Sequence, residues 1–367
     1  MTTANERCWA EIDLGALRQN ARFARERLGG KVALLAVVKA NAYGHGLAAV
    51  ANALREEAQL FGVANLREAA ELRQTVSQPV VILGPALPGE RRGIVDAGFI
   101  PSVSNYDEAR GFSRLAAGAT VAINCAIDTG MGRMGIAEAD VSVELKRIAA
   151  LPNLTLHSVS THLPVADEDA VYTREQLQRF QTVMTRLRRD VPGSYLVHTL
   201  PSAGVAGFAD SAYDIARAGL MLYGATSVPD FQKFLRPVLS LKTRIILVRE
   251  LAAGSSVSYG RTFIAPRALR VATLGAGYAD GLPRLISNRD AAVLIAGRRC
   301  PVLGRVTMDL TMVDVTAAPE VSVGDEAVLI GRQGDEEILA TEMAARASTI
   351  AWEIFTGIGS RVPRVYV

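Results

Sequence analysis

Eight short apolar segments, separated by stretches with the apolar spacing of a helix, constrain the fold more than any other feature of the sequence. The segments are VALLAVVK, LFGVAN, PVVILG, IPSVSN, TVAINCAID, LTLHSVSTH, YLVHTL and DIARAG, at residues 32–39, 60–65, 79–84, 100–105, 120–128, 154–162, 195–200 and 214–219. Short apolar runs that alternate with helical stretches indicate repeated βα units. Eight such units predict an α/β fold with a (β/α)8 TIM-like barrel, whose chemistry lies at the carboxyl ends of its strands.

The pattern changes after Pro237 to strands and turns, with one helix expected near ATEMAARAS. We therefore predict an N-terminal barrel domain at residues 1–237 and a C-terminal all-β domain at residues 238–367. The alternation in CWAEIDL indicates a further strand, through which residues 1–12 could pair with the β domain. Asp13 is placed to cap the helix that follows this strand.

Composition narrows the class of function. The 367 residues include 40 Lys and Arg against 37 Asp and Glu, and a charge so balanced lacks the basic face of a nucleic-acid-binding protein. Apolar runs stay far shorter than the ~18 residues of a membrane span, and the N-terminal sequence lacks the basic and apolar regions of an export signal. We expect a cytoplasmic protein that binds neither nucleic acid nor membrane. The few, scattered cysteines and histidines predict neither a disulfide framework nor a metal site.

Lys39 ends the first apolar segment, in AVVKANAYGHG, where a buried strand gives way to a glycine-rich turn. A desolvated lysine amine at a barrel mouth can form a Schiff base with a carbonyl substrate or with pyridoxal phosphate (PLP). The alternative is a solvated lysine at a strand end. His162 ends the sixth segment at the same end of the barrel, either as a functional group or as a satisfied core histidine.

Arg217 lies inside the apolar eighth segment, where a guanidinium is costly to bury without a partner. We therefore expect a polar group to pair with it. Gly219 and Leu220 follow directly, in the loop where barrels of this kind usually bind phosphate.

Two glycine-rich stretches, GHGLAA at residues 44–49 and GMGRMG at residues 130–135, match the fingerprint of a dinucleotide-binding turn. A nicotinamide dehydrogenase is therefore an alternative. That turn requires an acidic residue about 20 positions further along the chain. The strand after the first stretch ends in Asn65, and the second stretch carries Arg133 where a pyrophosphate needs a small residue. The sequence therefore argues against a dinucleotide site.

Assembled in order, these motifs resemble the alanine racemase family, PLP enzymes that interconvert L- and D-alanine. AVVKANAYGHG is similar to the family's PLP-lysine signature over its whole length. Further matches follow in the family's order: DTGMGRMG, STHL, the PSAG around Ser202, DIARAGLMLYG, VSYGRTF, GRVTMD and SRVPRV. The resemblance covers essentially the full chain. It implies a homodimer with shared active sites that supplies D-alanine for peptidoglycan.

The resemblance also implies which residues carry the reaction. Lys39 would hold PLP and act as one base, and Tyr259 would be the second base, reaching the site of the other subunit. His162, itself leaning on Arg217, would support Tyr259 as a base, and Arg217 would face the pyridine nitrogen.

Binding roles follow from the same resemblance. The residues that would hold the cofactor are Lys39, Tyr43, Ser202, Arg217, Gly219, Leu220 and Tyr223. The substrate carboxylate would be bound by Arg133 and by the backbone of the partner's Met308.

Two positions depart from the family pattern. Ala126 stands where the family often has a lysine, modified to a carbamate, that orients the arginine corresponding to Arg133. Arg133 must then be held by Asn124, by a bound anion or by water. Ser360 replaces a tyrosine that is common before RVPR, which removes one phosphate or pocket-wall contact.

Two alternative functions remain beside alanine racemisation. One is a broader amino-acid racemase of the same architecture, and the other is a PLP-binding protein without turnover. Basic amino-acid decarboxylases share the general plan, but the sequence lacks the glycine-rich phosphate loop expected of them.

The loss of a tyrosine side chain at Ser360 predicts a roomier pocket and hence some activity on serine. Racemisation of L-serine and L-alanine measured in one preparation checks this. An undetectable serine rate beside robust alanine turnover would contradict it.

Overall fold

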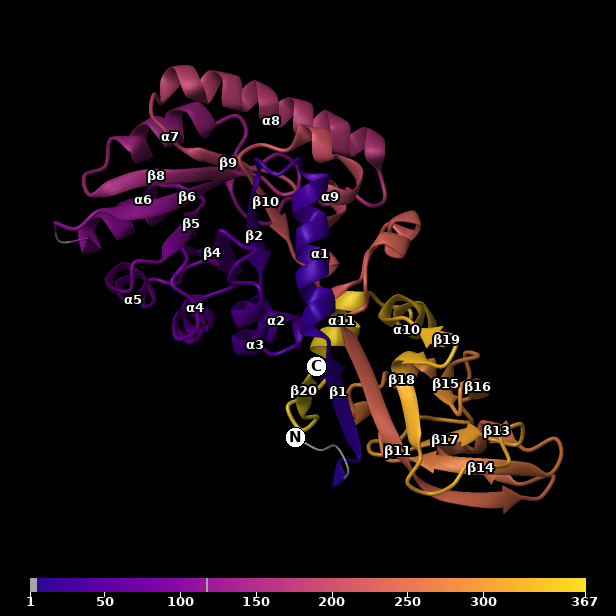
Figure 1. Cartoon of the computed structure of the whole chain (residues 1–367). Coiled ribbons are helices and arrows are strands. Elements are labelled where there is room, and N and C mark those ends of the chain that lie inside the picture. The colour runs from indigo at the N-terminus through magenta and orange to yellow at the C-terminus, as the bar shows by residue number, and fades with distance from the viewer. Residues whose placement is uncertain (1–4, 117) are drawn as a thin grey trace.

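The computed structural model of the chain describes residues 5–116 and 118–367 and confirms a barrel followed by a β-rich domain (Figure 1). Within these residues, eight parallel strands form the barrel: β2 (Ala33–Val37), β3 (Leu60–Val63), β4 (Val80–Pro85), β5 (Ile100–Val103), β6 (Val121–Asp128), β8 (Leu154–Ser160), β9 (Leu196–His198) and β10 (Ile215–Ala218). Each strand overlaps one of the eight predicted segments. Ser102 of β5 pairs with Asn124 of β6, and this pairing closes the barrel.

Helices surround the barrel: α1 (Leu14–Arg27), α3 (Leu47–Ala53), α4 (Leu66–Arg73), α5 (Arg91–Asp96), α6 (Tyr106–Leu115), α7 (Val141–Ala149), α8 (Ala170–Asp190) and α9 (Ser202–Gly207). Local sequence determines where several of them begin. The side chains of Asp13, Asn65 and Asn105 accept a backbone N–H from the first turn of α1, α4 and α6, which satisfies donors that a helix start leaves unpaired. None of the described helices is long and apolar enough to cross a bilayer.

The β domain is organised around one long strand, β11 (Leu239–Leu251), which pairs with β1 (Cys8–Ile12), β18 (Glu326–Gln333) and β14 (Leu269–Leu274). The remaining strands are β7 (Ile136–Ala137), a short partner of β6 in the barrel, and β12 (Ser256–Val257), β13 (Phe263–Ile264), β15 (Ala292–Ile295), β16 (Arg298–Pro301), β17 (Thr311–Asp314), β19 (Glu336–Ile338) and β20 (Arg364–Tyr366). Because β1 pairs with both β11 and β20, the two ends of the described chain meet in this domain.

Two α-helices interrupt the β domain, α10 (Ala340–Ala347) and α11 (Ala351–Thr356). The first is the predicted helix, but the prediction of a single helix is wrong. The six residues of α11 have no side-chain cap, and their apolar sequence is too short to show helical periodicity. In Figure 1, α11 lies at the junction of the two domains, beside the turn labelled α2 (Lys39–Tyr43).

Asn20 of α1 ties the barrel to the segment that enters the β domain. Its Nδ2 donates to the carbonyls of Leu222 (3.1 Å) and Arg236 (2.8 Å), and its Oδ1 accepts the N–H of Arg236 (2.9 Å). The side chain is almost fully buried. The bond to Leu222 is buried and the two bonds to Arg236 are partly buried, so Asn20 satisfies backbone groups that have little access to water.

We expect Asn20→Ala to lower the free energy of unfolding by about 2–4 kcal/mol. The substitution leaves the carbonyls of Leu222 and Arg236 and the N–H of Arg236 without hydrogen-bond partners. Chemical unfolding at fixed protein concentration measures this. The matched control is Asn52→Ala on the exposed face of α3, which loses one surface hydrogen bond to Arg55 and should change the free energy by less than about 0.5 kcal/mol. Equal losses in the two variants would contradict the role of Asn20.

Candidate active site

A cavity of about 850 Å³ lies at the carboxyl ends of the barrel strands, within the range of pockets that hold cofactors and small substrates. The structure brings most of the predicted site residues together in its wall: Lys39, Tyr43, Arg133, His162, Ser202, Arg217, Gly219 and Leu220. These residues come from loops after five different strands or from the strands themselves. The predicted motifs, far apart in the sequence, therefore meet in one place.

Lys39 follows the first barrel strand and is half-buried in the cavity wall. Burial lowers the pKa of its amine, the positive charge of Arg133 lowers it further, and Glu68 opposes the shift. Its amine has no hydrogen bond or ion pair with any residue in the described ranges. An amine in this setting loses its proton more readily than a solvated lysine and is the more available as a nucleophile or base.

The four residues after Lys39 form a left-handed helical turn. Ala40, Asn41, Ala42 and Tyr43 all have φ between 51° and 54°. For residues with a side chain this conformation costs roughly 1–2 kcal/mol each and normally occurs one residue at a time. A run of four persists only where its surroundings hold it, and strain of this kind concentrates at functional sites.

The left-handed turn places Tyr43 in the cavity wall, which Ser202 and Gly219 also line. A Cβ on Gly219 would lie 2.6 Å from the Tyr43 hydroxyl, so a larger residue there would have to displace that hydroxyl. Ser202 Oγ accepts the N–H of Gly219 (2.9 Å), and the N–H of Leu220 has no partner among the described residues. Hydroxyls and backbone N–H groups gathered in this way suit an anion such as a phosphate.

Tyr223 does not contact the cavity, in contrast to its predicted role as a cofactor ligand. It is fully buried at the end of a 3-10 turn (Leu220–Tyr223), and its hydroxyl donates to the carbonyl of Val37 (3.0 Å). Its ring stacks on that of Tyr43 with centroids 4.8 Å apart. Tyr223 therefore supports Tyr43 from behind.

Arg217 has the buried polar partners that its place in an apolar strand predicts. Its Nη1 donates to His198 Nδ1 (2.6 Å) and its Nη2 to His162 Nδ1 (3.3 Å). The other acceptors are the backbone carbonyls of Thr161, His198 and Thr199. Burial, with the charge of Arg133, lowers the pKa of Arg217 to about 10, so the group stays protonated at neutral pH.

The protonation of His162 and His198 follows from these bonds. A guanidinium can only donate, so Nδ1 accepts in both rings and the proton lies on Nε2. Burial lowers the pKa of His162 to about 3, assisted by the charge of Arg217, and the same two causes hold the pKa of His198 well below its usual value. His198 was not singled out from the sequence, although it lies inside the seventh predicted segment, residues 195–200.

Asn124 does not hold Arg133, so that alternative is wrong. Its Nδ2 donates to Ser102 Oγ and Ser160 Oγ (3.0 Å each), and its Oδ1 lies 3.2 Å from His198 Nε2. With its amide engaged inside the barrel, Asn124 has no group left for Arg133.

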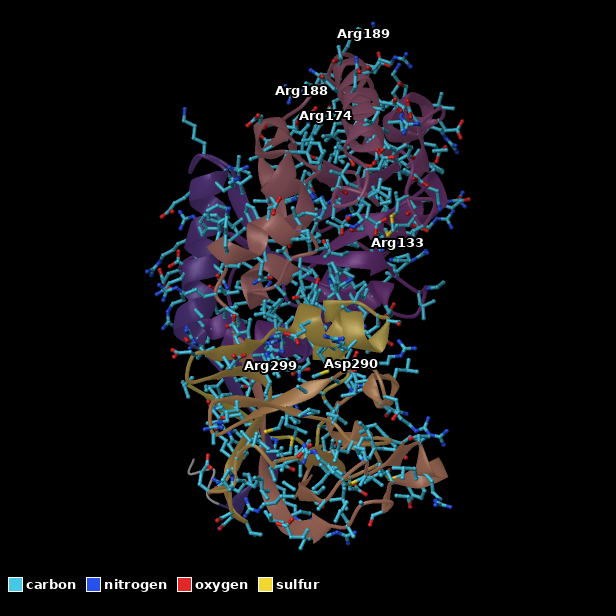
Figure 2. All side chains as sticks on the ribbon, turned by 90° about the vertical axis from the view of Figure 1, so that its right-hand side faces the viewer. Arg133, Arg174, Arg188, Arg189, Asp290 and Arg299 are labelled. Carbon is cyan, nitrogen blue, oxygen red and sulfur yellow. The ribbon has the colours of Figure 1, made fainter. Side chains whose placement is uncertain are left out.

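Arg133 itself makes no hydrogen bond or ion pair with a described residue. Figure 2 shows it at the side of the barrel nearer the β domain, whereas Arg174, Arg188 and Arg189 gather at the far end. Asp128 holds the loop before it, accepting the N–H groups of Gly130, Met131 and Gly132. Partial burial raises the pKa of Asp128, but these bonds outweigh it and leave the pKa below its usual value.

Tyr259 and Met308 lie outside the cavity of their own chain, on the β domain. Their exposed fractions are 71% and 54%, which is high for large apolar side chains. The loops that carry them are neighbours, because Ser258 Oγ donates to the carbonyl of Arg305 (2.6 Å). The β domain does reach the cavity of its own chain elsewhere, through Ile350 and Trp352, two residues that the sequence analysis missed.

Comparison with known proteins agrees with this geometry. The family models for the alanine racemase N-terminal domain and C-terminal domain match residues 12–227 and 238–366. The chain belongs to the alanine racemase family. The alanine racemase of Halothermothrix orenii is 42% identical over 368 residues, which are 98% of this chain and 96% of that protein.

Solved structures of the alanine racemase family share the fold throughout. The alanine racemase from D-cycloserine-producing Streptomyces lavendulae has a TM-score of 0.90 at 35% identity, covering 98% of this chain and 97% of that one. The alanine racemase from Bartonella henselae, with covalently bound pyridoxal phosphate, has a TM-score of 0.89 at 25% identity over 98% and 99% of the chains.

The buried neutral histidines predict a pH dependence of stability. Burial lowers the pKa of His45 to about 4, and His162 and His198 are shifted in the same direction. Below pH ~6.5 these histidines are protonated in the unfolded chain but stay neutral in the folded chain. The free energy of unfolding therefore falls as pH drops from about 6.5 toward 5. The expected loss is roughly 1.4 kcal/mol per pH unit for each histidine.

Urea unfolding between pH 7.5 and 5.0, at fixed protein concentration, measures this slope. His45→Phe should reduce it by the share of one histidine, and His157→Gln, at a half-buried site, should reduce it less. An unchanged slope in His45→Phe would contradict the buried neutral state.

Proposed function

We infer that the chain interconverts L-alanine and D-alanine, as membership of the alanine racemase family indicates, with PLP bound to Lys39 and a second base from another subunit. The observation that carries this proposal is the cavity, which combines a half-buried amine, a cluster of anion-binding donors and a buried guanidinium. When bound, PLP supplies an electron-withdrawing ring that weakens the α C–H bond of the attached amino acid.

The residues in the cavity wall fit PLP. The hydroxyl of Tyr43, Ser202 and the N–H groups of Gly219 and Leu220 would hold its phosphate. The Nε–H of Arg217 makes no hydrogen bond among the described residues, and it would donate to the pyridine nitrogen. Since a guanidinium essentially never gives up its proton, this nitrogen would stay unprotonated. We expect that to favour racemisation over transamination.

Racemisation removes a proton from one face of the α-carbon and adds one to the opposite face, so it needs a base on each side. The Lys39 amine, with its lowered pKa, supplies one. Tyr259 supplies the other from the partner subunit. His162 carries its proton on Nε2, and this N–H would donate to the phenolate oxygen of the partner's Tyr259 while Arg217 keeps the imidazole neutral.

A homodimer with shared sites accounts for the places of the remaining residues. The exposed Tyr259 and Met308 would enter the partner's cavity, so that residues 238–367 complete a site built on residues 1–237. Arg133, which bonds to no described residue, would bind the substrate carboxylate with the backbone of the partner's Met308. We propose that the enzyme works in the cytoplasm and supplies D-alanine for peptidoglycan.

The shared site predicts that two inactive variants restore activity when mixed. Lys39→Ala and Tyr259→Phe each remove one base, and each should lower alanine racemisation by about 10²–10⁴-fold. Dissociating and reassociating an equal mixture creates mixed dimers in which one of the two sites is intact. Random pairing should then recover roughly a quarter of the wild-type activity.

Interconversion of the enantiomers in deuterated water, followed by chiral analysis, provides the measurement. Remixing each variant with itself is the control and should recover nothing. Full activity of Tyr259→Phe in both directions would show that the two-base assignment is wrong. Two inactive variants that do not complement would contradict the shared site, and failure to bind PLP in the wild-type protein would contradict the function itself.

A further inference from the structure

The turn that follows Lys39 rests on the C-terminal segment of the β domain. A Cβ on Gly44 would collide with the carbonyl oxygen of Phe355, and one on Gly46 would collide with the hydroxyl of Tyr366. Between them, the ring of His45 lies 4.9 Å from that of Phe355. Three consecutive residues of the barrel therefore pack against residues more than 300 positions away in the chain.

Arg364 of β20 makes the most extensive polar contact in this region. Its Nε donates to the carbonyl of Gly44 (2.9 Å), at the end of the left-handed turn. Its Nη1 donates to the carbonyls of Gly359 and Val362 (2.6 Å each), and its Nη2 donates to that of Ile358 (2.7 Å). It forms no ion pair with a carboxylate in the described part of the chain, so carbonyl dipoles alone balance its charge.

Glu68 holds the other end of the same turn. Its carboxylate accepts the N–H of Ala40 (2.8 Å) and the N–H of Ala64 (2.8 Å). The left-handed run is thus fixed at its start by a carboxylate of the barrel and at its end by a guanidinium of the β domain. Without either constraint, Ala, Asn and Tyr residues would return to the right-handed or extended regions that they prefer.

We propose that Arg364 is a positioning residue that keeps Ala40 to Tyr43 in the left-handed conformation and so sets the directions of Lys39 and Tyr43. The β domain then acts on two sites: it offers Tyr259 to the partner subunit, and through Arg364 it shapes the lysine turn of its own chain. The consequence for catalysis rests on the proposed function of Lys39. The effect on the turn itself does not.

Amide hydrogen exchange in the PLP-free protein tests the effect on the turn. The amides of Ala42, Gly44 and Gly46 bond within the turn, to the carbonyls of Val38, Ala40 and Asn41. Arg364→Met should speed their exchange by roughly tenfold or more, since the turn loses its anchor while the rest of the fold stays closed. Exchange at the wild-type rate would overturn the proposal.

Arg270→Met is the matched control. Arg270 also lies in the β domain and also donates to carbonyls, those of Ala318 and Val321, but it does not contact the turn. Its loss should leave exchange in the turn unchanged. Equal acceleration in both variants would show a general loss of stability and would overturn the proposal. If Arg364→Met does not fold, Arg364→Lys provides the same comparison, because an ammonium has fewer donors and no fork geometry.

Kinetics of the PLP-loaded enzyme give a second readout. Arg364→Met should lower kcat for alanine racemisation by about tenfold or more and change KM by less than about threefold, because the substrate contacts are intact while the lysine is misplaced. Arg364→Lys should lie between this variant and the wild type. Faster exchange with unchanged kcat would overturn the claim that the turn positions Lys39. Faster exchange in a protein that proves unable to racemise alanine would leave the positioning intact and disprove the proposed function alone.

Discussion

The buried guanidinium of Arg217 is the constraint on which the rest of the site depends. It lies inside a barrel strand and pairs with no carboxylate among the described residues. Its charge is balanced by neutral acceptors, which are two imidazole nitrogens and three carbonyls. Because the guanidinium can only donate, it determines which nitrogen of His162 and His198 carries the proton. A single buried charge therefore sets the protonation of the groups around it.

The same charge orders a polar network across the barrel interior. Because its proton lies on Nε2, His198 donates to Asn124 Oδ1. The Nδ2 of Asn124 in turn donates to serines of β5 and β8. Buried networks of this kind are favourable only when every member is satisfied. Asn124, once a candidate to orient Arg133, is committed to this network instead, which leaves Arg133 available at the cavity wall.

The lysine turn shows how the two domains depend on one another. Ala40 to Tyr43 adopt a conformation that their side chains disfavour, and residues of both domains hold it in place. A barrel alone would lack Arg364, Phe355 and Trp352. The short strand β1 pairs with β11 and β20 of the β domain. Asn20 ties the barrel to the segment that enters that domain. The cavity is thus a product of the whole chain.

The sequence by itself determined the eight barrel strands, the change to β structure after Pro237 and the motifs that meet in the cavity, because short apolar runs and helix caps are local signals. It did not reveal the left-handed turn, since Ala and Tyr disfavour positive φ and Asn adopts it only as a single residue, not in a run of four. It also did not reveal α11, the cavity contact of Trp352, the inward direction of Tyr223 or the commitment of Asn124. Those depend on which side chains the folded chain brings together over distances of up to hundreds of residues, and only the tertiary structure decides that.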